Sequence, residues 1–225
     1  MIIYGKQPVY YLIEKHPQSI KTLFVSKELD KKEYSRLMRM DFELKRIPDN
    51  AAQSMSKTGN HQGFLAEVED LSLYDLKDLS KPEFILVLAG ITDMGNMGAL
   101  MRSAYALGVD AVVVTGIKHF NAENVVRSSA GAAYDMPIVH EHNLYDVMNE
   151  LKLDGFTLYG ADMDGEDVRK VEVKGKRALI MGSESEGIPS RALKKLDVKV
   201  SIEMQNNFDS LNVSVAGAIL MDRMR

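Results

Sequence analysis

The sequence contains no cysteine, and this absence excludes several kinds of chemistry at once. Disulfide bridges, zinc sites built from thiolates and thiol nucleophiles are all ruled out, which agrees with a reducing compartment. No apolar run approaches the length that spans a membrane, and residues 1–6 lack the basic-then-apolar layout of a signal peptide. We therefore expect a cytoplasmic protein with no membrane partner.

An excess of positive charge is also missing, because 28 Lys and Arg residues stand against 32 Asp and Glu, a formal net charge of −4. The total hides an asymmetry. Residues 1–66 carry 11 Lys and Arg against 7 Asp and Glu, whereas residues 67–225 carry 17 against 25. A basic front portion on an acidic body is a weak indication of polyanion binding. An ordinary lysine-rich surface explains the same counts equally well.

Length and composition predict a folded protein of one or two domains. The chain has 225 residues, of which 45% are hydrophobic and 27% charged, as is usual for a globular protein with a sizeable core. The front portion is typical of a small α/β module, and a linker follows it, ending at Pro82, which disfavours helix in the residue before it. Within the module we expect helices at residues 9–15 and 31–40 and strands at residues 22–26 and 63–68.

From residue 84 onward, short apolar runs alternate with helical segments. Continuous apolar runs of strand length indicate strands that are buried on both faces, and their alternation with helices is typical of a parallel sheet covered on both sides. The fold class is therefore α/β. The expected strands are residues 85–89, 111–115, 136–140, 156–161, 177–181 and 198–202.

Sheets of this kind bind ligands at the carboxyl ends of their strands, and the residues after the first run are rich in glycine. Residues 90–104 lack both the Lys-Ser/Thr pair of a phosphate-binding P-loop and the glycine spacing of a dinucleotide site. The missing spacing argues against a nicotinamide-dependent dehydrogenase. What remains is a tight turn with Asn96 and, further along the helix, Arg102. A solvated position on the opposite helix face explains Arg102 equally well.

Two more polar segments follow the last two runs. Residues 182–189 place two carboxylates between two glycines, a pattern that a plain turn before Pro189 also explains. Residues 201–209 lead into the terminal helix, and Asp209 or Ser210 is the expected N-cap of that helix. Capping by either of these residues leaves Asn212 without an explanation.

The terminal helix is apolar on nearly every side until Asp222. A helix on a protein surface usually has one apolar stripe and one charged face, so this helix must be buried from two directions. One interpretation is that it closes its own core. The other is that a second copy of the chain packs on it as well.

No segment has the ligand spacing of a metal site. Residues 162–167 are acidic, but their oxygen spacing is not that of a calcium loop, and an acidic surface turn is the better interpretation. His119, His140 and His142 lack both metal spacing and a carboxylate partner visible in the sequence. We expect no metal.

Taken together, the polar segments at the strand ends resemble the SpoU family of RNA ribose methyltransferases. Nearly the whole chain takes part in the resemblance, and the three main motifs occur in family order. The matching segments are residues 96–99 with 102–104, 182–184 with 187–188, and 202–216, together with 127–132 and the two ends of an RNA-binding domain, 4–9 and 61–66.

The resemblance implies an architecture, a methyl donor and partners. It implies an RNA substrate-binding domain of ribosomal-protein type at residues 1–70, a linker at 71–82, and a methyltransferase domain with a deep trefoil knot at 83–225. It further implies a homodimer with the site completed across the interface, S-adenosylmethionine as methyl donor, and RNA as substrate. Methylation of a guanosine 2′-hydroxyl in 23S rRNA is the first expectation. The alternatives are a tRNA guanosine methyltransferase and a noncatalytic RNA-binding protein with this fold.

By the same resemblance, the site residues fall within the three motifs. The residues expected to bind the cofactor are Gly182, Ile202, Met204 and Leu211. The residues expected in catalysis are Asn96, Arg102, Glu184, Ser210 and Asn212. Candidates for contacts with RNA phosphates are Lys6, Lys31, Lys32, Arg36 and Arg39.

Arg102 matches the family's catalytic arginine, but a guanidinium is always protonated and has no acceptor. A role as general base is therefore physically strained. We expect Arg102 to hold the neighbouring phosphate and to stabilise developing alkoxide charge. A phosphate oxygen, a water molecule or Glu184 would then receive the proton of the hydroxyl.

The chain departs from the family pattern just before the terminal helix. Glu203 and Asn206 occupy positions where the family commonly has proline and glycine. These residues differ in backbone preference, and Glu203 adds a charge. The shape of this loop is therefore the least determined part of the expected site.

Overall fold

The computed structural model describes residues 1–57, 59–205 and 210–225, and the chain forms two compact units. The first unit combines Met1–Leu71 with Asn121–Tyr134, and the second combines Ser72–Phe120 with Asp135–Arg225. The front module therefore includes a segment that comes from the middle of the sequence.

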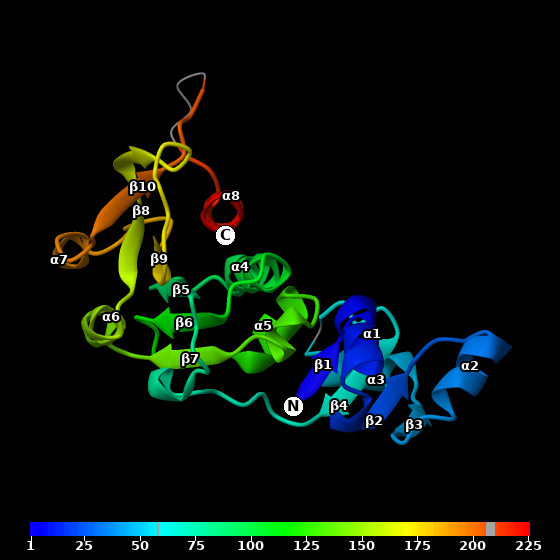
Figure 1. The fold of residues 1–225 in the computed structure, drawn as a ribbon. Helices are drawn as coiled ribbons and strands as arrows, with labels where there is room; N and C mark the ends of the chain where they lie inside the picture. Colours follow the sequence, from blue (N-terminus) through cyan, green and yellow to red (C-terminus); the bar gives the residue numbers. More distant parts are fainter. Residues whose placement is uncertain (58, 206–209) are drawn as a thin grey trace. The chain divides into compact units, whose positions relative to one another are not determined.

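The first unit is built on a four-stranded sheet with the order β1-β4-β2-β3 (Figure 1). Strand β4 runs antiparallel to β1 and β2, whereas β2 pairs in parallel with β3. Helix α1 lies against β1 and β4 and buries its apolar side chains there. The elements are β1 (Ile2–Tyr4), α1 (Lys6–Lys15), η1 (Pro17–Ser19), β2 (Ile20–Val25), α2 (Lys31–Leu37), β3 (Glu43–Arg46), α3 (Asp49–Met55) and β4 (Phe64–Val68).

Four of these elements lie where the sequence predicts them, namely α1, β2, α2 and β4, although α1 begins three residues earlier and α2 ends three residues sooner than expected. Strands β1 and β3 and helix α3 are not anticipated. Strand β3 has the sequence ELKR and is largely exposed, so no apolar pattern marks it. It forms as an edge strand through its backbone pairing with β2.

The segment from the middle of the sequence carries α5 (Ala122–Ser128) and the 3-10 turn η3 (Ala132–Tyr134). Glu123 accepts a hydrogen bond from the backbone N–H of Ile2 at 3.1 Å. The guanidinium carbon of Arg127 lies 4.8 Å from the centre of the Tyr4 ring, within the range of a cation–π contact. This segment, which includes the motif at residues 127–132, is thus held within the first unit.

The second unit contains a six-stranded sheet with the order β10-β8-β9-β5-β6-β7, and every pair of neighbouring strands is parallel. The α/β fold class and the parallel sheet are confirmed, because each predicted apolar run forms a strand. The elements are η2 (Leu76–Asp78), β5 (Phe84–Ala89), α4 (Met94–Ala106), β6 (Ala111–Thr115), β7 (Ile138–Glu141), α6 (Leu144–Leu153), β8 (Thr157–Asp167), β9 (Arg177–Gly182), α7 (Ser190–Leu193), β10 (Val198–Ser201) and α8 (Val213–Met224).

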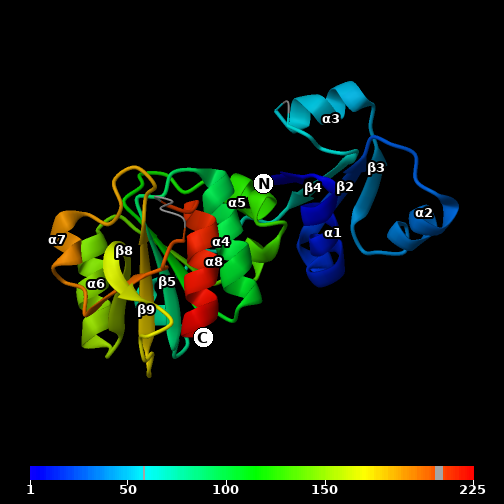
Figure 2. The same ribbon diagram turned by 90° about the horizontal axis from the view of Figure 1, so that it is seen from above.

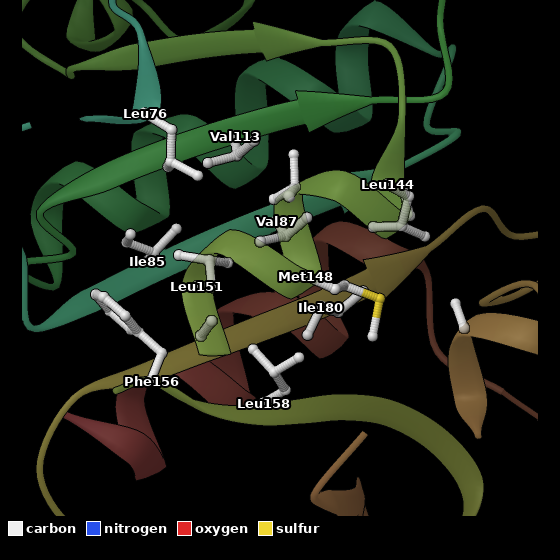
Figure 3. Close-up of a cluster of buried hydrophobic side chains, with 14 of the residues drawn as sticks. Leu76, Ile85, Val87, Val113, Leu144, Met148, Leu151, Phe156, Leu158 and Ile180 are labelled. Carbon is white, nitrogen blue, oxygen red and sulfur yellow. The ribbon is translucent and has the colours of Figure 1, made fainter. Parts of the chain in front are cut away.

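Helices cover both faces of this sheet, with α6 and α7 on one side and α4 and α8 on the other (Figure 2). On the first side, Ile85, Val87 and Ile180 from the strands pack against Met148 and Leu151 of α6 (Figure 3). Burial of these side chains holds the central strands in place. It therefore also sets the positions of the carboxyl ends of these strands.

Strand β8 is longer than the sequence suggests, and the interpretation of residues 162–167 as a surface turn is wrong. These residues belong to β8, whose last residues Glu166 and Asp167 pair with Val200 and Ser201 of β10. The pairing register shifts before Val200, so that residues 161–165 form a bulge between the two registers. Backbone pairing with a later strand, rather than apolar alternation, therefore extends β8.

Helix α8 lies side by side with α4 (Figures 1 and 2). Their approach is close at Gly217, where an added Cβ atom would lie 2.3 Å from the Cδ2 atom of Leu100. On the opposite side of α8, Val215 and Ile219 are 47% and 36% exposed. Within a single chain, the helix is therefore covered from one direction only. No helix in the described ranges is long and apolar enough to cross a membrane.

We predict that Gly217→Ala lowers the free energy of unfolding by about 1–3 kcal/mol, because the new methyl group must displace the fully buried Leu100. Denaturant unfolding followed by circular dichroism measures the change. Leu100→Ala should cost less in the Gly217→Ala background than in the unmodified protein, since it removes the clash. Strictly additive costs would contradict this account of the α4–α8 contact.

Candidate active site

The three motifs meet at the carboxyl edge of the parallel sheet. One follows β5 and opens α4, one follows β9, and one follows β10 and leads into α8. Strands β9 and β5 are direct neighbours in the sheet, and α8 packs on α4. The order of the strands, rather than the order of the sequence, thus brings the three segments together.

Asn96 is placed by the start of α4. The side chain of Asp93 caps this helix, and its Oδ1 atom accepts a hydrogen bond from the backbone N–H of Asn96 at 2.7 Å. A cap of this kind satisfies an amide that the helix leaves without a partner. The Asn96 side chain is therefore directed from a fixed first turn rather than from a free loop.

Glu184 lies on a closed turn after β9. The backbone N–H of Gly187 donates to the carbonyl oxygen of Ser183 at 2.9 Å, and the N–H of Glu186 donates to the Ser183 hydroxyl oxygen at 3.2 Å. Gly182 permits this closure, because a Cβ atom at that position would lie 2.0 Å from the carbonyl carbon of Gly187. The turn that the sequence suggests is thus present, and it carries Glu184 at a defined place.

Asn212 is the N-cap of α8, which corrects the expectation that Asp209 or Ser210 caps this helix. Its Oδ1 atom accepts hydrogen bonds from the backbone N–H of Ser214 at 3.0 Å and from the Ser214 hydroxyl at 2.6 Å. The helix begins at Val213. Ser210 lies outside it, and Asp209 lies outside the described residues. Capping therefore does explain Asn212, although only in part.

Asn96, Glu184 and Asn212 come together in what we call the Asn–Glu–Asn cluster. The Nδ2 atom of Asn212 lies 2.7 Å from Oε1 of Glu184 and 2.9 Å from Oδ1 of Asn96. The Nδ2 atom of Asn96 donates to the same Oε1 atom at 3.4 Å. Three of the five expected catalytic residues, from three separate segments, thus share one hydrogen-bond network.

The network leaves one carboxylate oxygen of Glu184 open. The Oε1 atom also accepts the backbone N–H of Val213, the first residue of α8, at 3.2 Å. A carboxylate at this point interacts favourably with the positive end of the helix dipole. Among the described residues, all hydrogen bonds of Glu184 go to Oε1, so Oε2 is available to a ligand or a proton.

Two hollows lie beside this cluster in the second unit. The first has a volume of about 510 Å³, and its wall includes Ile202, Met204, Ser210, Leu211 and Ala216. The second has a volume of about 750 Å³, shares Ser210, Leu211 and Ala216 with the first, and reaches Gly182, Glu184 and Asn212. Each expected cofactor-binding residue therefore lines at least one hollow.

Arg102 stands apart from these residues. It lies on α4 two turns or less beyond Asn96, it is exposed, and it lines neither hollow. No hydrogen bond or ion pair joins its side chain to another described residue. Ser210 lines both hollows without a described hydrogen-bond partner. Within one chain, the structure thus assembles the amides and the carboxylate but not the arginine.

Several residues at the site are not anticipated from the sequence. Asp93 and Ser214 hold the ends of the two helices, and Asp162 and Met163 from the β8 bulge line both hollows. Asp93 stands three residues before Asn96, a spacing typical of a helix cap, so this signal is present in the sequence. The β8 residues carry no such local signal.

The expected RNA-contacting residues belong to the first unit. Lys31 and Lys32 open α2 and are exposed, as is Arg39 just beyond it, and none has an ion-pair partner among the described residues. Arg36 is less free, because it pairs with Glu33 at 3.1 Å. Glu33 also accepts a bond from Tyr10, whose pKa is raised to about 12 by burial first and by this bond second. Lys6, at the start of α1, lies 5.8 Å from the centre of the Tyr10 ring.

Across the described ranges, no group of three or more His, Asp or Glu side chains is arranged to hold a metal ion. The rings of His140 and His142 lie 5.2 Å apart, but each contacts the carbonyl oxygen of Ile117, at 3.1 and 3.2 Å. A backbone carbonyl thus accounts for the position of both rings.

Comparison with known proteins identifies two family models along the chain. Residues 83–222 match the model of the SpoU rRNA Methylase family. Residues 2–74 match the model described as RNA 2′-O ribose methyltransferase substrate binding. Together the two models cover both parts of the chain in the order that the sequence motifs indicate.

Individual relatives match over nearly the full length. The 23S rRNA (guanosine-2′-O-)-methyltransferase RlmB of Pseudomonas putida is 32% identical, and the match covers 99% of this chain and 95% of the relative. The enzyme of the same name from Haemophilus ducreyi is also 32% identical, over 97% of this chain and 94% of its own. Among solved structures, the SpoU methyltransferase AviRb from Streptomyces viridochromogenes in complex with AdoMet has a TM-score of 0.81 at 24% identity, covering 100% of this chain and 88% of its own.

We predict that replacing Asn212 separates its two roles. Asn212→Ala removes the helix cap and should lower the free energy of unfolding by about 0.5–2 kcal/mol, whereas Asn212→Ser supplies a capping oxygen and should recover most of that loss. Neither variant restores the bond to Glu184. Glu184→Ala should therefore cost less in the Asn212→Ser background than in the unmodified protein. Equal costs, measured by denaturant unfolding, would show that the two side chains are not coupled.

Proposed function

The chain belongs to the SpoU rRNA methylase family, and on this premise we propose that it transfers a methyl group from S-adenosylmethionine to the 2′-hydroxyl of a guanosine in 23S rRNA. The observation that carries the proposal is the 32% identity to 23S rRNA guanosine methyltransferases over 99% of this chain. That match includes the front portion, where residues 2–74 fit a substrate-binding family model. Ribosomal RNA as substrate supports a cytoplasmic location.

The residues around the first hollow fit the proposed methyl donor. A volume of about 510 Å³ lies within the range of small-molecule sites. Ile202, Leu211 and Leu220 supply apolar surface for a planar base, and backbone groups of Ile202 and Leu211 would meet its uncharged edge. S-adenosylmethionine, when bound, supplies a methyl group made electrophilic by a sulfonium centre. Ile202, Met204 and Leu211 would hold it there, and Gly182 would contact it from the adjoining second hollow.

The chain's own part in the chemistry is to orient the hydroxyl and to accept its proton. A neutral ribose hydroxyl is a poor nucleophile, and a group within hydrogen-bond reach must take its proton. Glu184 Oε2 is suited to this, because Oε1 is held by Asn212 and the start of α8. Asn96 and Ser210 would orient the ribose, while Arg102 would hold the adjacent phosphate and stabilise alkoxide charge.

A homodimer is part of the same proposal. The face of α8 that carries Val215 and Ile219 is exposed, and the charge of Asp222 comes only at the end of this face. A second copy of the chain would bury this apolar strip and so supply the cover from a second direction that the apolar sequence of the helix predicts. Arg102 would then act in the site of the partner, which agrees with its distance from the hollows of its own chain. The trefoil knot implied by the family resemblance also belongs to this proposal.

We predict that the purified protein incorporates label from methyl-labelled S-adenosylmethionine into unmodified 23S rRNA, at a guanosine whose 3′ linkage resists alkali. Arg102→Lys should retain donor binding yet lose most turnover, because lysine lacks the guanidinium fork that grips a phosphate with two hydrogen bonds. Unmodified tRNA serves as the competing substrate. Label in tRNA alone would favour the tRNA alternative, and label in neither pool would remove the enzymatic function. Near-normal turnover by Arg102→Lys would refute the role of Arg102.

We predict that two inactive variants complement each other if Arg102 acts in the partner's site. Arg102→Ala and Asn212→Ser chains, co-expressed with different tags, should regain about one quarter of normal activity, because half of the dimers are mixed and each has one complete site. Purified mixed dimers should reach about half of normal activity. If Arg102 serves its own chain, mixed dimers remain inactive.

Equilibrium sedimentation of Ile219→Asp tests whether the chain forms a dimer through this face of α8, and we expect the variant to be a monomer.

A further inference from the structure

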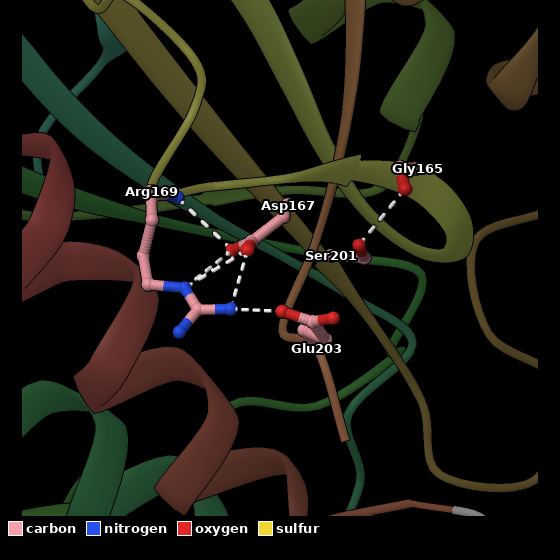
Figure 4. A network of polar contacts seen from close by, with 5 residues as sticks. All are labelled: Gly165, Asp167, Arg169, Ser201 and Glu203. Atoms are coloured by element: carbon pink, nitrogen blue, oxygen red, sulfur yellow. Dashed lines mark hydrogen bonds and ion pairs between the residues drawn. The ribbon is translucent and has the colours of Figure 1, made fainter. Parts of the chain in front are cut away.

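The guanidinium of Arg169 bonds to two carboxylates, those of Asp167 and Glu203 (Figure 4). Its Nε atom lies 2.8 Å from Oδ2 of Asp167, and its Nη2 atom lies 2.6 Å from the same oxygen. The Nη2 atom also donates to Oε2 of Glu203. Asp167 and Glu203 both line the first hollow, whereas Arg169 does not. We call these three residues the Arg169 latch.

One carboxylate ends a strand and the other follows a strand. Asp167 is the last residue of β8 and pairs with Ser201, the last residue of β10. The backbone N–H of Val168 donates to the carbonyl oxygen of Ser201 at 2.9 Å, which closes the ladder. Glu203 stands two residues beyond that point. The latch therefore connects the paired ends of β8 and β10 to residues 202–205, which follow β10.

Residues 202–205, which follow Ser201, form few polar contacts with the other described residues. Among the described residues, residues 202–205 take part in no backbone hydrogen bond, and the pair between Glu203 and Arg169 is their one polar contact. Ile202 and Met204, on either side of Glu203, line the first hollow. The bond from Arg169 to Glu203 is thus the one polar restraint, among the described residues, on the segment that carries both side chains.

The two ion pairs of the Arg169 latch differ in burial. The Asp167 side chain is 8% exposed, and donation by Arg169 holds the pKa of this carboxyl below its usual range. The same pair raises the pKa of Arg169, so the guanidinium stays charged. Glu203 is 52% exposed, and an ion pair at that exposure contributes little to overall stability. The Glu203 contact therefore bears on the position of one segment rather than on folding.

We propose that Arg169 is a positioning residue for methyl-donor binding, acting through Glu203 to hold residues 202–204 against the first hollow. This inference rests on the proposed function, in which that hollow takes S-adenosylmethionine. Glu203 stands where the resemblance leads one to expect a proline, whose ring fixes the backbone without a partner. Here the ion pair between Arg169 and Glu203 restrains the segment instead. Donor affinity therefore depends on a side chain far from the motif in sequence.

The test measures the Kd of S-adenosylmethionine by calorimetry together with the KM for the donor and kcat in methyl transfer, using the full-length protein. Glu203→Gln should weaken donor binding and raise KM about two- to fivefold, with kcat nearly unchanged, since it removes an exposed ion pair and no reacting group. Arg169→Gln should weaken binding at least as much. Arg169→Lys, which retains the charge, should recover part of the loss.

A rescue separates positioning from a general loss of structure. Glu203→Pro restrains the segment without needing Arg169, so the double variant Arg169→Gln with Glu203→Pro should bind the donor more tightly than Arg169→Gln alone. Glu172→Gln is the matched control, because it breaks a surface ion pair with Lys174 at 2.7 Å in the connection after β8. It should leave the Kd unchanged.

The outcomes divide clearly. The first outcome is that the unmodified protein and Glu203→Gln bind the donor equally well, with circular dichroism showing that the variant is folded. The latch then has no positioning role, and the proposed function stands. If kcat falls while KM stays constant, the role assigned to Arg169 is also wrong. If the unmodified protein binds no donor, the proposed function fails and this inference fails with it.

Discussion

A single carboxylate oxygen, Oε1 of Glu184, joins the three segments on which the candidate site depends. It accepts from the Asn212 side chain, from the first amide of α8 and, at a longer distance, from Asn96. The three elements involved are already close because β5 and β9 are neighbours and α8 packs on α4. The sheet brings the segments within reach, and the shared oxygen fixes their side chains. The backbone N–H of Ser214 donates to Asn212 and fixes that side chain in the network, while Oε2 of Glu184 stays open.

The walls of the two hollows beside the cluster are restrained by different physical means. On the β9 side, the close approach of Gly182 to the Gly187 backbone allows a hydrogen-bonded turn that needs no charge. On the β10 side, residues 202–204 leave the ladder and rely on the Arg169 latch. A backbone restraint is indifferent to salt, whereas an exposed ion pair is screened by it. The second hollow thus has a wall held by backbone hydrogen bonds, whereas the wall of the first hollow at residues 202–204 is held by side-chain electrostatics.

Helix α8 links fold, site and assembly through its three sides. Asn212 caps the start of the helix, and the first helical amide donates to Glu184. The small residue Gly217 allows the close approach to α4. On the exposed side, Val215 and Ile219 are apolar. An apolar strip that the rest of the chain does not bury favours association with a second copy. The same helix would therefore couple dimer formation to the geometry of the Asn–Glu–Asn cluster, since a shift of α8 moves both.

The sequence by itself determined the α/β class, the six strands of the parallel sheet and the motifs that meet at the site, because apolar periodicity and short polar patterns are local properties of the chain. It could not determine that residues 162–167 extend β8, that Asn212 rather than Ser210 caps α8, or that residues 121–134 pack with the front unit. Nor could it reveal that Arg169 holds Glu203. The extension of β8, the packing of residues 121–134 and the bond to Arg169 depend on contacts between residues distant in sequence, and only the tertiary structure decides which of the many possible partners come within reach. The cap at Asn212 is a local contact, but several neighbouring polar residues are suited to that role, and the course of the chain decides which one takes it.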